Sequence, residues 1–181
     1  IDRRNPARAI ELLEPLRSSA PNDPQLLSLL AAAYMAERRY DLATPLLDRA
    51  VRVAGGAPDV RSEFGVSLIG GGQTELGFSQ LQQAFAKDPG QAHAGVMLTT
   101  LYLNRGQTKK ALEVIDAVVR RDPRNVNAVN LQGVVRVAAG DRPGGRAAYE
   151  SALALDPRYH AARLNLARLD LAEGKPDAAR L

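Results

Sequence analysis

The chain has 181 residues, 45% of them hydrophobic and 24% charged, which is enough apolar side chain to bury a core and predicts a folded protein. It has no cysteine and two histidines, which excludes disulfides, thiolate metal sites and a cysteine nucleophile and leaves room for at most a single-histidine metal site. Its net charge of +4 comes from basic residues scattered among 20 acidic ones, a distribution that argues against a nucleic-acid partner.

A 34-residue period runs through the whole chain. Pro21, Pro89, Pro123 and Pro157 fall on one lattice of this period, and Gly55 occupies the remaining lattice point between them, with no insertion or deletion. A fixed period of this kind indicates a repeat architecture, in which each repeat is one supersecondary unit. With the prolines numbered as position 32, the chain divides into a partial repeat at 1–21, repeats at 22–55, 56–89, 90–123 and 124–157, and a partial repeat at 158–181.

Ten helices are expected, an A helix and a B helix in each repeat, with a further stub from Pro176. Their expected ranges are 6–17, 24–37, 41–53, 58–70, 75–87, 92–105, 109–121, 126–139, 143–155 and 159–173. Pro15 lies well inside the first, where it removes the N–H that would bond the Glu11 carbonyl, so a kink or an early end is expected there. Pro45 also lies away from a junction, but it is nearer a first turn and disturbs its helix less.

Residue size within the frame indicates how the helices pack. Large apolar residues at position 24 and mostly at position 7 are expected to be core side chains. Small residues dominate positions 8, 20 and 27, which are predicted to be buried where helices cross. Position 8 is Ala31, Gly65, Thr99, Gly133 and Ala167, and position 20 is Ala9, Ala43, Gly77, Ala111, Gly145 and Ala179. Position 27 is Leu16, Ala50, Ala84, Val118 and Ala152. Position 15, the turn after helix A, is Gly72, Gly106, Gly140 and Gly174, with Arg38 as the exception. Glycine there can take the left-handed conformation that ends a helix.

This pattern resembles the tetratricopeptide repeat, a 34-residue helix-turn-helix unit, over the whole chain. The resemblance implies an all-α tetratricopeptide solenoid, a right-handed superhelix in which A helices line the concave face and B helices cover the outside. Tyr34 and Tyr102, at position 11, are then expected to be core residues. Ile1 and Leu181 fall in the middle of repeats, which predicts a fragment of a longer array.

The fourth whole repeat departs most from the pattern. It places Gln132 at position 7 and Arg136 at position 11, one helical turn apart on a face that should be apolar. Asp170 occupies position 11 of the next repeat. We expect an ion pair between Arg136 and Asp170 with Gln132 close enough to hydrogen-bond, and a ligand site is the alternative.

No pattern of catalytic or cofactor-binding chemistry is present. The sequence contains no GxxxxGK[ST], GxSxG, HExxH or paired CxxC motif, which predicts a protein that is not an enzyme and has no catalytic, cofactor-binding or metal-binding residues. The run of glycines at 70–72 fits a helix end better than a phosphate cradle. The apolar stretch 26–36 is too short to cross a bilayer, and the first residues are not a signal peptide.

The concave face is where we expect a partner to bind, on residues at positions 2, 5, 9, 12 and 13 of the A helices. Its middle combines apolar and amide side chains, which suits an extended or helical protein segment. A bare trough without a partner is the alternative. The predicted contact residues are His93, Thr100, Asn104, Asn127, Asn130 and Arg168. Of these, Asn127 and Asn130 are expected to point their side chains into solvent.

Several phrases, above all 165–177 (NLARLDLAEGKPD), with 12–16 (LLEPL) and 130–133 (NLQG), resemble the tetratricopeptide lipoproteins of the PEP-CTERM and exosortase system (PrsT). This resemblance implies a periplasmic or outer-membrane-associated scaffold of exopolysaccharide production and protein sorting, with a possible lipid anchor in the full-length chain. Two alternatives remain. One is a cytosolic adaptor that grips a peptide, although the carboxylate-clamp residues of chaperone adaptors are absent, and the other is the array of a larger enzyme such as a glycosyltransferase.

Overall fold

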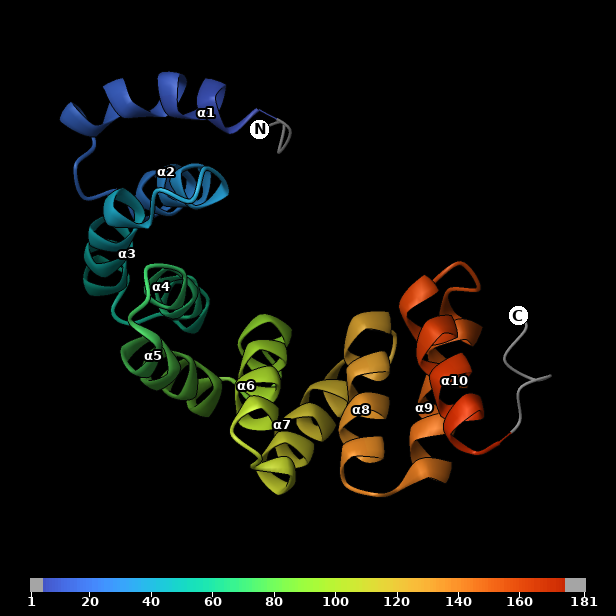
Figure 1. Cartoon of the computed structure of the whole chain (residues 1–181). Helices are drawn as coiled ribbons and strands as arrows, with labels where there is room; N and C mark the ends of the chain where they lie inside the picture. The colour runs from blue at the N-terminus through green and yellow to red at the C-terminus, as the bar shows by residue number, and fades with distance from the viewer. Residues whose placement is uncertain (1–4, 175–181) are drawn as a thin grey trace. The chain divides into compact units, whose positions relative to one another are not determined.

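The computed structural model of the chain describes residues 5–174, and every regular element in that range is a helix (Figure 1). The α-helices are α1 (Pro6–Leu13), α2 (Pro24–Ala36), α3 (Tyr40–Val53), α4 (Pro58–Gly70), α5 (Thr74–Lys87), α6 (Ala92–Asn104), α7 (Thr108–Arg121), α8 (Val126–Ala138), α9 (Arg142–Leu155) and α10 (His160–Ala172). A 3₁₀ helix, η1 (Glu14–Ser18), follows α1. The all-α prediction is confirmed, and the expected bounds are met closely except in the first helix. The expected stub lies outside the described residues.

Pro15 ends the first helix early, as predicted. The α-helical hydrogen bonding of α1 stops at Leu13, and the chain continues as the tighter η1. Pro45, by contrast, is accommodated within α3, where it lies near the first turn.

Backbone conformation at position 15 separates each A helix from its B helix. Gly72, Gly106 and Gly140 have φ of 85°, 69° and 87°, which confirms the predicted left-handed turns. Arg38 occupies the same position with φ of 58°. Because its Cβ crowds the following carbonyl, this conformation costs on the order of 1 kcal/mol that glycine would not.

Packing divides the chain into two compact units, one ending at Ala94 and one beginning at Gly95 within α6. In the first unit α2 packs on α3 and α4 packs on α5, and contacts of α3 and α2 with α4 join the two pairs. In the second unit α8 packs on α9, and α10 contacts both of them. Within each unit, these contacts join helices that are neighbours along the chain or successive A helices, as expected of a solenoid.

Glycines at positions 8 and 20 allow paired helices to approach closely. A Cβ added to Gly65 of α4 would lie 2.9 Å from the carbonyl oxygen of Gly77 on α5, and one added to Gly133 of α8 would lie 3.0 Å from that of Gly145 on α9. The described residues at positions 8, 20 and 27 are buried, apart from Leu16 and Ala167, which confirms the predicted crossings. Ala179 lies outside the described residues.

Arg136 does not pair with Asp170, so that prediction is wrong. The Arg136 guanidinium lies 3.1 Å from the Asp141 carboxylate and 3.8 Å from that of Asp116. Gln132 also contacts Asp116, to which its amide donates a hydrogen bond of 2.7 Å. The partners of Arg136 thus lie on α7 and at the turn before α9, whereas the predicted partner, Asp170, lies on the next A helix.

Position 11 explains the difference, because it faces the B helix that precedes its own A helix. The Asp170 carboxylate accepts a hydrogen bond of 2.5 Å from Arg146 of α9, and the same guanidinium reaches Glu173 at 2.9 Å. Tyr34 of α2 likewise donates to Glu14 of η1 at 3.1 Å. Tyr34 is buried as predicted.

Candidate functional site

Positions 2, 6, 9 and 13 of the A helices form one face, which we call the helix-A face. At about 100° per residue these positions lie on one side of a helix, and positions 2 and 13 are exposed in every described A helix. In the second unit the face consists of Thr100, Asn104, Asn127, Leu131, Val134, Ala138, Ala161, Asn165, Arg168 and Ala172.

Position 5, predicted to belong to this face, lies between A helices instead. Ser62 and Asn130 are buried there. In α10, the last helix described, Leu164 at the same position is 52% exposed. The reason is that position 5 of one A helix faces position 6 of the next, so each successive repeat covers it.

Asn130 shows this arrangement directly. Its side chain accepts a hydrogen bond of 3.0 Å from the Nδ2 of Asn165, and Asn130 is 9% exposed. The expectation that Asn130 points into solvent is therefore wrong. Asn165 is half-buried, and its Oδ1 makes no hydrogen bond within residues 5–174, so it offers an acceptor on the helix-A face.

Asn127 is exposed, as predicted, and is held in place by the following repeat. The hydroxyl of Tyr159, just before α10, donates a hydrogen bond of 2.7 Å to its Oδ1. The Asn127 Nδ2 then remains as a donor with no partner in the described part of the chain. Together, Asn127 and Asn165 present one amide donor and one acceptor with fixed orientations, which match the needs of a peptide backbone.

The other predicted contact residues are exposed, but they lie in different places. Thr100 and Asn104 are on α6, and Arg168 is on α10, all within the second unit. The Thr100 hydroxyl donates to the Val96 carbonyl at 3.1 Å and is therefore partly used within its own helix. His93 is exposed on the first turn of α6, in the first unit.

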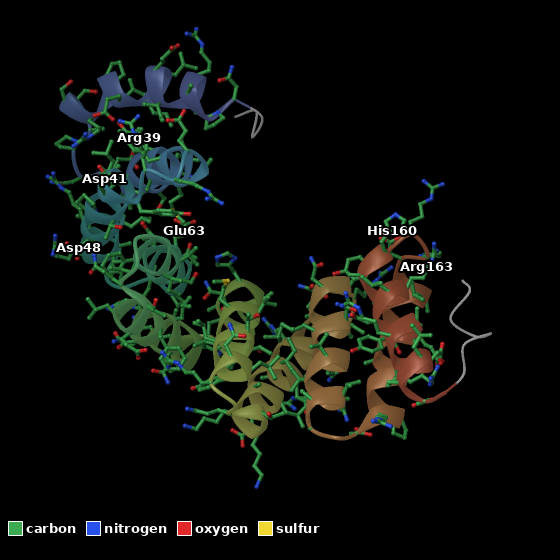
Figure 2. The ribbon with its side chains drawn as sticks, viewed as in Figure 1. Arg39, Asp41, Asp48, Glu63, His160 and Arg163 are labelled. Carbon is green, nitrogen blue, oxygen red and sulfur yellow. The ribbon has the colours of Figure 1, made fainter. Side chains whose placement is uncertain are left out.

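A half-buried carboxyl distinguishes the helix-A face of the first unit. Glu63 of α4 (Figure 2) and Ser28 of α2 place a side-chain oxygen each in the interior, and neither oxygen makes a hydrogen bond of normal geometry. Burial raises the pKa of Glu63, an effect that the nearby Ser28 hydroxyl offsets only in part and the Asp59 carboxylate reinforces. The Asn130 and Asn165 pair occupies the equivalent positions 5 and 6 in the second unit.

Two residues of this arrangement, Tyr159 and Asn165, were missed from the sequence. The signal that could have revealed them is spacing, because their hydrogen-bonded partners lie 32 and 35 residues earlier, about one repeat away. Polar pairs at such separations indicate contacts between successive repeats.

Within residues 5–174, no three histidine, aspartate or glutamate side chains lie close enough together to hold a metal ion. Over the same residues, no helix combines the length and the apolar character that a bilayer span requires.

A family model described as tetratricopeptide repeat matches residues 1–62, 68–133 and 136–181 of the chain. Among curated proteins, the tetratricopeptide repeat and J domain-containing co-chaperone DNJ1 of Fusarium oxysporum is 33% identical over 79 residues, covering 44% of this chain and 15% of the relative. The chain spans a quarter or less of the length of the curated relatives it matches.

Solved structures share the fold. MamA of Desulfovibrio magneticus RS-1 superposes with a TM-score of 0.73 at 20% identity, covering 86% of this chain and 88% of that one. YrrB, described as a tetratricopeptide protein with an unusual peptide-binding site, has a TM-score of 0.68 at 19% identity, covering 91% and 84%. At these identities the likeness concerns the fold alone.

Proposed function

Because the chain belongs to the tetratricopeptide-repeat family, we propose that it is a non-catalytic scaffold that holds a protein or peptide segment against the helix-A face of its second unit. The observation that carries the proposal is the pair of oriented amides on that face. Asn127 offers a donor and Asn165 an acceptor, and each is fixed by a hydrogen bond across the boundary between repeats.

The surroundings of these amides suit a polypeptide. Leu131 and Val134 lie on the same face of α8 and are half-buried, so they can cover apolar side chains of a bound segment. Preorganised amides reduce the entropy lost on binding, because their side chains are already ordered. The peptide-binding site in the description of YrrB is compatible with this role.

A binding experiment tests the proposal. Peptides are selected from a random-sequence display library on the 181-residue chain, and their affinity is measured by fluorescence anisotropy. Asn127→Ala with Asn165→Ala is expected to weaken binding by at least about tenfold, the effect of losing one or two hydrogen bonds to buried backbone groups. The matched control is Lys109→Ala with Glu113→Ala, which alters two exposed residues of the B helix α7. A loss of affinity in the control with none in the asparagine variant would overturn the proposal.

A narrower role follows from the sequence phrase at 165–177. We propose that the full-length protein is exported and acts in an envelope system of exopolysaccharide production and protein sorting. Fractionation of cells producing the tagged full-length protein is expected to find it in the periplasm or on the outer membrane. Recovery from the cytosol alone would favour the second candidate, a cytosolic peptide adaptor. The similarity to a tetratricopeptide co-chaperone supports this candidate.

A further inference from the structure

A pocket of about 300 Å³ lies in the first unit between η1 and α3. Its floor includes Leu27 and Tyr34 of α2, at positions 4 and 11. At about 100° per residue these positions lie roughly opposite the helix-A face of the same helix. The pocket is thus distinct from the peptide-binding face proposed above and does not depend on it.

The hollow lies in the groove between two successive B-helix segments, η1 and α3, over position 11 of α2. A similar hollow of about 310 Å³ lies between α3 and α5 over Leu68, which is position 11 of α4. The groove therefore recurs along the first unit, and the residues that line its first instance set that one apart.

The lining combines apolar walls with a basic edge. Leu42, Pro45 and Leu46 of α3 supply apolar surface, and Arg17 and Arg49 supply two guanidinium groups against the single carboxylate of Glu14. The formal charge of the lining is therefore +1, from two arginines less one glutamate.

The carboxylate of Glu14 is already occupied. It pairs with Arg17 at 2.5 Å and accepts the Tyr34 hydroxyl at 3.1 Å. Arg49, in contrast, donates its Nε to the neutral Oδ1 of Asn22 at 2.8 Å, and no carboxylate within residues 5–174 lies at ion-pair distance from it. Both terminal NH₂ groups of Arg49 can therefore donate hydrogen bonds to a ligand, and its positive charge can attract an anion.

A second ion pair lies close by. The guanidinium of Arg39 (Figure 2) is 4.9 Å from the centre of the Tyr34 ring that lines the pocket, and it pairs with Glu37 at 3.5 Å. Within residues 5–174, Arg49 is therefore the cation of the lining that has no carboxylate partner, at the edge of an otherwise apolar hollow. An inorganic anion would leave the apolar walls unused, whereas a carboxylate next to an apolar side chain matches both parts of the lining.

We propose that this pocket binds an acidic segment of a partner polypeptide, with one carboxylate paired to Arg49 and a neighbouring apolar side chain against Leu42, Pro45 and Leu46. The planar guanidinium accommodates a carboxylate through two parallel hydrogen bonds. The scaffold would then have two recognition surfaces, one in each unit.

A labelled peptide of alternating leucine and glutamate tests the proposal, with a second peptide in which glutamine replaces glutamate. Anisotropy titration of the 181-residue chain is expected to show saturable binding of the acidic peptide and at least about tenfold weaker binding of the glutamine peptide. Arg49→Gln should reduce binding of the acidic peptide by a similar factor. The matched control is Arg52→Gln, on the same helix, whose side chain is 69% exposed and pairs with Asp48, and it should leave affinity within about twofold.

Circular dichroism melts check that both variants fold, as is expected of substitutions at exposed positions. Equal losses for Arg49→Gln and Arg52→Gln would indicate general charge attraction and overturn the proposal, as would equal binding of the two peptides. Light scattering that shows a dimer abolished by Arg49→Gln would assign the pocket to a second copy of this chain and also overturn it. Asn127→Ala with Asn165→Ala should leave binding unchanged, which keeps this result separate from that of the helix-A face.

Discussion

The carboxylate of Asp170 and the guanidinium of Arg146 lie 2.5 Å apart and join α10 to α9. The Asp170 side chain is 5% exposed, so removing its cation would leave a buried negative charge without a partner. The hydrogen bond to Asp170 raises the pKa of Arg146, so the guanidinium stays charged at neutral pH.

Arg146→Ala is therefore expected to lower the free energy of unfolding by about 3 kcal/mol, the usual cost of breaking a buried pair. Arg8→Ala, which breaks the exposed pair with Glu11, should cost less than about 1 kcal/mol. Urea unfolding followed by circular dichroism measures both. Similar losses for the two variants would show that the Asp170 pair is not the buried support described above.

Gly77→Ala is expected to destabilise the first unit by about 2 kcal/mol, because the added methyl group would overlap the Gly65 carbonyl and Ile69. Gly72→Ala provides the comparison. A Cβ there meets nothing within 4 Å, and the cost, on the order of 1 kcal/mol, comes only from its φ of 85°. Thermal unfolding should rank the Gly77 variant as the less stable, and the reverse order would contradict the close crossing of α4 and α5.

Glu63 should make stability depend on pH. Burial raises its pKa in the folded protein above the ordinary value of 4.5, so the folded state binds the proton more tightly than the unfolded state does. This contribution to stability is present below 4.5 and is lost as pH rises through the folded-state value. Glu63→Gln should thus match the wild type in acid and exceed it in stability at neutral pH. Urea titrations in acid and at neutral pH test this. The control is Glu11→Gln, at an exposed position, which is expected to show no gain in stability at neutral pH.

The two amide contacts on α8 should differ in their effect on stability. Asn130→Ala removes a buried acceptor and leaves the Asn165 amide without its partner, which should cost about 1 to 3 kcal/mol. Tyr159→Phe removes only the hydrogen bond to the exposed Asn127, where water can replace it, so the loss should be under about 1 kcal/mol. Equal losses in chemical unfolding would contradict the burial of Asn130.

The 34-residue period and the sizes of residues within it were sufficient to predict the helices and their crossings. Pairs such as Gly65 and Gly77 could be predicted to meet because the repeat fixes both the length of each helix and the turn between them. The early end at Pro15 could be predicted as well, because a missing N–H disrupts local hydrogen bonding whatever the surroundings.

Side-chain partners were decided by the tertiary structure. Position 11 faces the preceding B helix, which gave Asp170 to Arg146 and turned Arg136 toward Asp116. Position 5 lies against the next A helix, which buried Asn130. The rotation of each helix about its axis determines these pairings, and that rotation is set by packing against neighbours a whole repeat away. For the same reason the lining of the hollow between η1 and α3 could not be inferred from the sequence.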